Sequence, residues 1–442
     1  MRWCGTFGRC LEATSDGAWR GSRDGRASFA KRCPAYRRLP PLFRRASGLI
    51  LVSVDGLALR GGWLLRPIAV ALVGLLLAQG PASPQRAAIA LGAAEPTTTE
   101  PHAPIAQIFD QPPVDLLTEP ANVYQATLSD LAPAVADIAP RVYVPNELSN
   151  SVTVIDPETL AVVGRIPVGA SPQHITPSWD LTKLYVNDTG LTEIDPRTGA
   201  VVRRIPVQFP YNLYFTLDGS KAIVVDENLN RLDFYDPSAW RLLRSVSIPC
   251  AGIDHMDMSA DGSYLLASCE FNGVLVKVDT NAMAIISTLV VGGFPVDVKL
   301  APAGDVFFIA NQATNGVSII DPKSMKVVGF IGTGRGAHGF AFSRDTRSLY
   351  VSNRLAGTIS VIDVATRTVR ANWVVGGSPD MLTVSADGRQ LWTGNRYAST
   401  VVVIDTATGK VVKSIAVEKA PHGLTFFPQP GRLSLGHNGV YR

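Results

Sequence analysis

Hydrophobic and polar positions alternate in short runs along most of the chain, and one phrase recurs among these runs. An apolar or aromatic residue precedes an aspartate, and a short turn and a second apolar run follow it. The phrase occurs seven times, at Asp156, Asp195, Asp236, Asp279, Asp321, Asp363 and Asp405. Successive spacings are 39, 41, 43, 42, 42 and 42 residues. A fixed period of this length, built from short alternating runs, predicts a radial arrangement of seven β-sheet blades.

Each repeat resolves into four strands. In residues 339–375 the runs GFAFSRD, SLYVSN, TISVID and TVRANWVV are separated by polar turns, which fits one four-stranded blade with its first strand innermost. The first three runs of the repeat region, from residue 141 onward, match the second to fourth strands of a blade, and residues 422–427 match an innermost strand. We therefore predict an all-β, seven-bladed β-propeller of four-stranded blades, closed by three N-terminal strands plus one C-terminal strand. Such closure leaves no free sheet edge.

The sequence outside the repeats divides into three parts. Residues 1–82 are rich in arginine and contain the apolar run PIAVALVGLLLA at 67–78, which fits the core of an export signal and is short for a membrane span. A cleaved signal is the first interpretation, and an uncleaved membrane anchor is the second. Residues 83–140 are rich in Pro, Ala and Thr and predict a linker or an extended arm. The propeller is expected over 141–428, and the tail 429–442 is expected to cross a face of the ring.

The phrases LYVN, LYVSN and VYVPN, followed by TVIDP-like text, carry a family resemblance. Over residues 141–428 the chain resembles the YVTN/YncE-like family of β-propeller repeat proteins. This resemblance implies an exported protein, secreted, periplasmic or at the cell surface. The chain is also distantly similar to the copper-bearing propeller of nitrous oxide reductase and to the propeller of haem-d nitrite reductase. No ligand residues are carried over from either.

The repeat aspartates give a register in which one position is chemically distinctive. It lies 17 to 19 residues after each aspartate, just before or within the innermost strand, and is occupied by His174, Asn212, His255, Asp297, His338, Asp380 and His422. Imidazoles and carboxylates are ligands for zinc and copper, so we expect a ring at the channel mouth with His255 and His338 as metal candidates. The same groups suit acid–base chemistry on an organic ligand. The alternative is structural, with each histidine hydrogen-bonded to the neighbouring blade.

Loops on the same face of the propeller contribute acidic and basic side chains. The earlier blades offer Glu227 and Glu270, and the later blades offer Arg335, Arg354 and Arg396. An acidic side opposite a basic side suits a polar or zwitterionic ligand, although a solvated rim has the same composition. Cys250 and Cys269 are expected to lie near His255. They form a disulfide, remain as buried thiols, or join His255 in a soft-metal site.

Composition narrows the function further. Charged residues make up 18% of the chain and the net charge is +4, with no basic stripe on the repeats, so nucleic acid is not an expected partner. The sequence has no Cys-x-x-Cys-His for covalent haem and no phosphate loop or dinucleotide motif. We expect an exported binding module that presents the ring to a small molecule, a copper or zinc ion, or a protein. The alternatives are a metal-assisted oxidoreductase or lyase that uses the ring, and a structural or adhesive surface protein with an inert channel.

Overall fold

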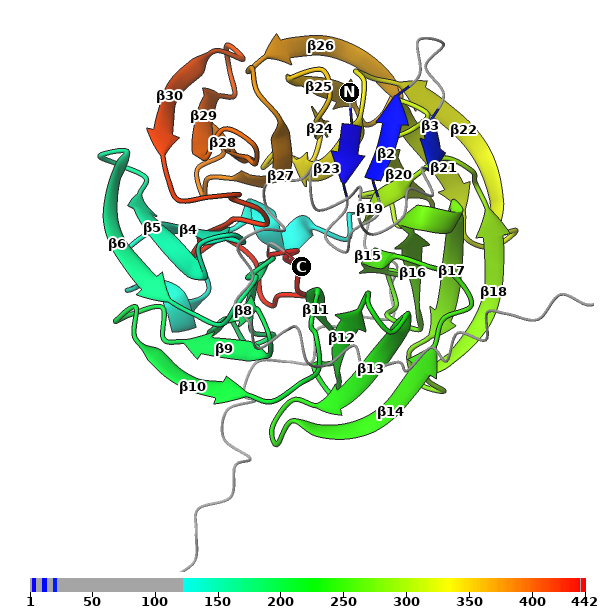
Figure 1. Ribbon diagram of the computed structural model, residues 1–442, viewed down its shortest axis with the longest axis horizontal. Coiled ribbons are helices and arrows are strands. Elements are labelled where there is room, and N and C mark those ends of the chain that lie inside the picture. The colour runs from blue at the N-terminus through cyan, green and yellow to red at the C-terminus, as the bar shows by residue number, and fades with distance from the viewer. Residues whose placement is uncertain (1, 5–9, 14–18, 22–121, 438) are drawn as a thin grey trace, which may run out of the picture. The chain divides into compact units, whose positions relative to one another are not determined.

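Seven four-stranded antiparallel sheets surround a common axis in the computed structural model (Figure 1). The structure describes residues 2–4, 10–13, 19–21, 122–437 and 439–442. The all-β, seven-bladed architecture predicted from the repeats is confirmed. The apolar run 67–78 lies outside the described residues. Within those that are described, no helix is both long and apolar enough to cross a bilayer.

A separate small sheet lies at the N-terminus of the chain. It contains β1 (Arg2–Cys4), β2 (Cys10–Ala13) and β3 (Trp19–Gly21), paired in that order. It belongs to a unit of residues 1–110 that is distinct from the unit of residues 111–442. The aspartate repeat begins far beyond this segment and does not predict these strands.

Each blade runs outward from the axis in chain order, and blades 1 to 6 contain β7–β10, β11–β14, β15–β18, β19–β22, β23–β26 and β27–β30. Their innermost strands are β7 (Ile175–Pro177), β11 (Asn212–Phe215), β15 (Ile253–Met258), β19 (Pro295–Leu300), β23 (Ala337–Phe342) and β27 (Pro379–Val384). The second strands are β8 (Leu184–Asn187), β12 (Ala222–Asp226), β16 (Tyr264–Cys269), β20 (Phe307–Asn311), β24 (Ser348–Asn353) and β28 (Gln390–Asn395). The third strands are β9 (Leu191–Ile194), β13 (Arg231–Asp236), β17 (Val274–Asp279), β21 (Gly316–Asp321), β25 (Thr358–Asp363) and β29 (Thr400–Asp405). The outermost strands are β10 (Val201–Ile205), β14 (Arg241–Ser247), β18 (Ala284–Val290), β22 (Lys326–Gly332), β26 (Thr368–Val374) and β30 (Val411–Ala416).

Blade 7 closes the ring with both ends of the repeat region. Its order is β31 (Thr425–Phe427), β4 (Arg141–Asn146), β5 (Ser151–Asp156) and β6 (Ala161–Pro167). The C-terminal β31 pairs with the N-terminal β4 in antiparallel register, Thr425 opposite Tyr143 and Phe427 opposite Arg141. The predicted closure by three N-terminal strands plus one C-terminal strand is therefore confirmed.

The seven repeat aspartates have an architectural role at the turns between third and fourth strands. Asp156, for example, accepts hydrogen bonds from the backbone N–H groups of Glu158 and Thr159 at 2.9 and 3.0 Å. Because these bonds favour the carboxylate, the bond from Thr159 above all, the pKa of Asp156 is lowered. The carboxylate fixes the turn locally, as aspartates in such turns do.

The hydrophobic core lies between the blades as a ring of contact layers. One layer joins blades 1 and 2 through Leu191, Leu213 and Phe215, and another joins blades 5 and 6 through Ile359 and Leu391. Outermost strands are largely exposed, as in β14 and β22. Each blade buries its faces against its neighbours, so the fold needs the full ring for its core.

The residues that precede β4 pack against the propeller. They contain the 3-10 helices η4 (Gln125–Leu128) and η5 (Pro133–Val135). The backbone N–H of Val123 donates to the carbonyl of Pro302 at 2.8 Å, and the Tyr124 hydroxyl donates to the Leu300 carbonyl at 2.9 Å. We call residues 122–140 the arm. Its contacts lie where innermost strands end, on the side of the ring away from the loops that lead into them.

The C-terminal tail, residues 428–442, turns back into the channel (Figure 1). It pairs with the inner edge of β11, because Phe215 N–H donates to the Leu435 carbonyl at 3.0 Å and His437 N–H donates to the Leu213 carbonyl at 3.1 Å. Gly436, with φ +112°, lies against the backbone of Tyr214, where a side chain has no room. The tail thus brings His437 onto the axis from outside the repeat pattern.

Candidate functional site

The predicted ring residues lie inside the channel. All seven are at most 3% exposed, so they form part of the interior, and the expectation that they stand open at the channel mouth is corrected. In four blades the ring residue sits in a β-bulge of the innermost strand: the register shifts across His255, Asp297, His338 and Asp380. A bulge re-aims a side chain, which here turns it toward the axis.

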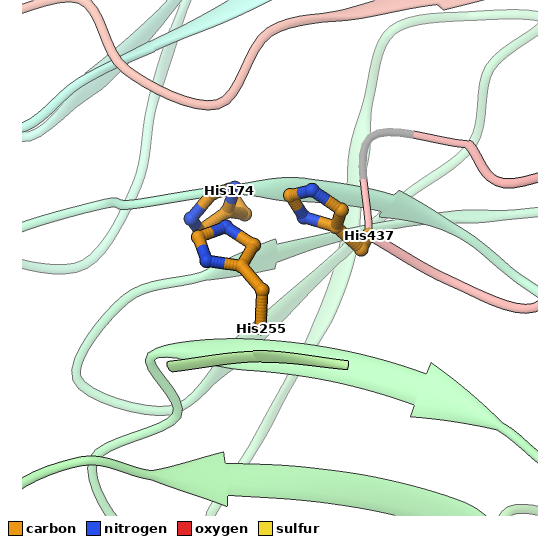
Figure 2. A group of neighbouring side chains, drawn as sticks. All are labelled: His174, His255 and His437. Carbon is orange, nitrogen blue, oxygen red and sulfur yellow. The ribbon is translucent and has the colours of Figure 1, made fainter. Parts of the chain in front are cut away.

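Three histidines converge on the axis from different parts of the chain. His174 precedes β7, His255 is on β15, and His437 comes from the tail (Figure 2). One ring nitrogen of each lies within 4.8 Å of the others. Such a triangle encloses a point less than about 3 Å from all three atoms, and imidazole–zinc bonds are about 2.0–2.1 Å. Shifts of about 1 Å would complete a coordination shell. We call these residues the three-histidine site.

Two imidazoles of the three-histidine site have a polar side chain behind one ring nitrogen, as metal-binding imidazoles require. The Nδ1 of His255 lies 2.7 Å from the Asp254 carboxylate, while its Nε2 is buried and has no hydrogen-bond partner among the described residues. The Asn212 amide lies 3.0 Å from Nδ1 of His437. Carboxylates and amides behind a ligating imidazole fix its tautomer and orientation. Asn212, predicted as a ring member, therefore supports a histidine that the repeat pattern did not include.

Charges around this site act in opposite directions on two of its histidines. Burial, the largest single effect, lowers the pKa of His255, but the carboxylates of Asp254, Asp297 and Glu270 together outweigh it and the net pKa is raised. Burial and the nearby His255 hold the pKa of His437 well below its usual value. His437 is thus neutral and ready to ligate, and metal binding at His255 would release a proton.

His338, Asp380 and His422 form a second group whose ligand atoms also lie within 4.8 Å of one another. The Asp380 carboxylate lies 2.8 Å from His338 Nε2, 3.5 Å from His422 Nε2 and 2.8 Å from the Arg354 guanidinium. Arg396 adds a second guanidinium at 3.7 Å from the same carboxylate. We call this group the Asp380 hub. A metal ion here would face two guanidinium groups, so the hub suits internal ion pairing.

The four histidines of the predicted ring therefore divide between two groups. His255 and His338, expected together as metal candidates, belong to different groups. Asp297 contacts His437 at 3.5 Å and also accepts the Phe340 backbone N–H at 2.8 Å. Gly423 packs directly against the His174 ring, which leaves no room for a side chain there. The recurrent His-Gly step thus has a packing reason.

The predicted acidic and basic rim residues are partly brought together. Glu227 and Glu270 are buried beside Asp254; burial and this neighbour raise the pKa of Glu270 to about 8 and hold that of Glu227 well above its usual value. Arg354 is buried on the opposite side, where the Arg396 side chain, 12% exposed, pairs with Glu147. The interpretation as a solvated rim is wrong for the buried Glu227, Glu270 and Arg354. Arg335 is exposed, and its carbonyl accepts the backbone N–H of Leu355, the residue after Arg354, at 3.2 Å.

Cys250 and Cys269 form a disulfide with a Cα–Cα distance of 6.0 Å. It ties the loop before β15 to the end of β16. A disulfide offers no thiolate ligand, so the soft-metal interpretation of these cysteines with His255 does not apply.

A family model for YNCE-like beta-propellers matches residues 116–430. The chain belongs to the YNCE-like β-propeller family. This confirms the resemblance to YVTN/YncE-like repeat proteins. No curated protein matches the sequence significantly.

Solved structures support the fold of this YNCE-like propeller. A functionally unknown protein from Desulfotomaculum acetoxidans has a TM-score of 0.56 and 16% identity, covering 65% of this chain and 98% of that one. Dihydro-heme d1 dehydrogenase NirN in complex with DHE gives 0.51 and 17%, with coverages of 67% and 76%. Hydrazine synthase from Kuenenia stuttgartiensis gives 0.50 and 17%, with coverages of 56% and 87%. At these identities the likeness concerns the fold alone.

Sequence reasoning missed two parts of the three-histidine site. His437 lies after the last repeat, so the aspartate register could not place it; its one signal is a histidine between glycines in the segment GHNG. Asp254 precedes the ring position by one residue, so the register did not include it. Its one signal in the sequence is the Ile-Asp-His step, which has a carboxylate directly before a ring histidine.

Proposed function

We propose that this YNCE-like propeller is an exported metal-binding module that holds one zinc or copper ion at His174, His255 and His437. The observation that carries the proposal is the buried, unpartnered Nε2 of His255, which faces two further imidazoles and has Asp254 behind its Nδ1. Three histidines with one remaining position are the donor set of open, nitrogen-rich zinc sites, and imidazole equally suits copper.

Metal content after reconstitution tests this proposal. Full-length protein is stripped with a chelator, loaded separately with zinc or copper, desalted and analysed for bound metal. We expect about one ion per chain in the native protein and in His338→Gln, and none retained in His255→Gln. The His338→Gln variant is the matched control, because it alters a buried histidine of the Asp380 hub. Native protein that retains no metal, or retention in His255→Gln, would overturn the proposal.

Export is part of the proposed function and rests on separate observations. Disulfides persist in oxidising compartments, which fits Cys250–Cys269. The apolar run 67–78 fits an export signal. Fractionation of producing cells should recover the protein outside the cytosol, without its first residues. Recovery of the untruncated protein from the cytosol would contradict export.

A metal-assisted enzyme is the second candidate, and Glu270 is the observation that favours it. Burial and Asp254 raise the pKa of this carboxyl to about 8, so it carries a proton at neutral pH near His255. A positioned acid near a metal is the arrangement that oxidoreductases and lyases use. Turnover that is lost in both Glu270→Gln and His255→Gln would support this candidate, whereas turnover retained in either variant would oppose it.

A further inference from the structure

A cavity that is distinct from the three-histidine site opens at the end of the channel where the arm and the tail pack. Its volume is about 80 Å³. Since one water needs about 10–15 Å³ by this measure, the cavity has room for roughly five to eight non-hydrogen atoms. Phe342, Ser343 and Arg344 in its wall are partly exposed, so solutes can reach it.

Lys299 on β19 is the most unusual group in this cavity. It is only 8% exposed, yet it makes no hydrogen bond or ion pair within the described part of the chain. Its aliphatic stem is buried, while its Nζ keeps some exposure and no partner in that part, so the ammonium group faces the solvent of the cavity. An anion bound in the cavity would supply the missing partner.

Arg344 gives the cavity a second cation. Its Nη2 donates to the Ser385 carbonyl at 2.9 Å and also contacts Gln429, but its Nε has no hydrogen-bond partner among the described residues. Burial lowers its pKa to about 10, against a smaller opposite effect of Tyr441 and Asp387. The wall contains no aspartate or glutamate. The cavity therefore has two cationic side chains with no carboxylate among its lining residues.

The remaining wall is partly apolar and partly polar, and this mixture favours an organic anion. Phe340, Leu382, Val384 and Val440 contribute hydrocarbon surface, and Thr346 and Thr383 contribute hydroxyls. An inorganic oxyanion would leave the apolar surface without a partner, whereas a short organic acid satisfies both parts. We propose that the cavity binds a small organic monocarboxylate, with its carboxylate at Lys299 and Arg344 and its hydrocarbon part against Phe340, Leu382 and Val384.

Carboxylate binding does not require the proposed metal. His437 borders both sites and Lys299 is close enough to help lower its pKa, but Lys299 and Arg344 belong to neither the three-histidine site nor the Asp380 hub. Carboxylate binding should therefore be measurable in protein stripped of metal. Failure to bind carboxylate and failure to bind metal would be separate results.

Calorimetric titration and thermal unfolding of the full-length, metal-free protein test the inference. The probes are butyrate and inorganic phosphate at constant ionic strength. We expect butyrate to bind and to raise the midpoint of unfolding, because it binds the folded state alone. The variant Lys299→Met should weaken butyrate binding at least tenfold, and Lys299→Arg should retain part of it. The exposed Lys413→Met is the control and should bind as the native protein does.

Unfolding without ligand adds a second readout. Because Lys299→Met keeps the buried aliphatic stem and removes an ammonium group that has no partner among the described residues, its midpoint should equal or exceed that of the native protein. A lowered midpoint in this variant would show a structural lysine and would overturn the inference. So would absence of butyrate binding, binding of phosphate in place of butyrate, or butyrate binding that Lys299→Met leaves unchanged.

Discussion

The two buried histidine groups occupy the same level of the propeller and differ in the charges around them. At the three-histidine site, the carboxylate of Asp254 lies behind His255, and burial and then Asp254 raise the pKa of both Glu227 and Glu270. At the Asp380 hub, one carboxylate lies among two imidazoles and two guanidinium groups. One group has an excess of carboxylates and the other an excess of cationic groups.

This difference follows from which residues the blades contribute beside the same register position. Blades 2 and 3 end their second strands near Glu227 and Glu270, whereas blades 5 and 6 place Arg354 and Arg396 there. An excess of carboxylates favours a bound cation, and guanidinium groups oppose it. The repeat thus supplies equivalent positions, and neighbouring loops decide whether a histidine there is available to a metal or used in an internal ion pair.

The largest effect should come from breaking the Asp380 hub. Asp380→Ala leaves Arg354 buried without its nearest carboxylate, and removing one partner of a buried pair typically costs about 3–5 kcal/mol. Urea unfolding of the metal-free protein measures the loss. Asp254→Ala is the matched control, and we expect it to cost less than about 1 kcal/mol, because it removes a carboxylate from an acidic group. Equal losses in the two variants would contradict the comparison.

The next effect concerns metal affinity. His437→Ala removes one of three imidazoles, and we expect affinity for zinc or copper to fall at least about 100-fold, which is about 2.7 kcal/mol. His422→Ala should change affinity by less than about threefold, because His422 belongs to the Asp380 hub. Competition with a chromogenic chelator measures both. A larger loss in His422→Ala than in His437→Ala would move the metal to the hub.

The sequence predicts the blades and the level of the histidines, but not how the histidines divide between these two groups. The aspartate spacing was sufficient for the blades and their closure, because every turn repeats the same local hydrogen bonds. It also placed His174, His255, His338 and His422 at one level. Which of them meet depends on bulges in the inner strands, which the aspartate spacing does not show, and on the tail, which lies outside the repeats. His437 could not be aligned at all, and charged neighbours such as Asp254 and Arg354 belong to single blades and do not repeat.

A smaller effect should distinguish the carboxylate behind His255 from the more distant carboxylate of Asp297. Asp254→Asn preserves the shape of the side chain and removes the charge that orients the imidazole. Changes to a group that is hydrogen-bonded to a ligating histidine cost about 10- to 100-fold in metal affinity. Chelator competition should show this loss with one ion still bound at saturation. The control is Asp297→Asn, whose carboxylate lies 3.5 Å from His437; its effect should be the smaller one.

The smallest effect is a change of the free energy of unfolding with pH. It should depend on Glu270 on the acidic side of the channel and not on Glu147 on the basic side. Glu270 has a folded pKa of about 8, raised by burial and then by Asp254, against an ordinary value of 4.5. Between these values the folded chain keeps a proton that the unfolded chain has released, so the free energy of unfolding falls as pH rises. The loss is at most about 1.4 kcal/mol per pH unit for one group.

Urea unfolding of the metal-free protein between pH 6 and about pH 8 measures this slope against the linkage expected for one proton. Glu270→Gln should reduce the slope by the contribution of one proton, because the amide stays neutral as the carboxylic acid does below its pKa; Glu227, whose pKa is also raised by burial, keeps its own contribution. Glu147→Gln is the matched control, since Glu147 pairs with Arg396 on the basic side and should leave the slope as it is. If Glu270→Gln keeps the native slope, the carboxyl is already ionised at neutral pH. The acidic side would then hold its full negative charge without metal, and the contrast between the two groups would be greater than the raised pKa implies.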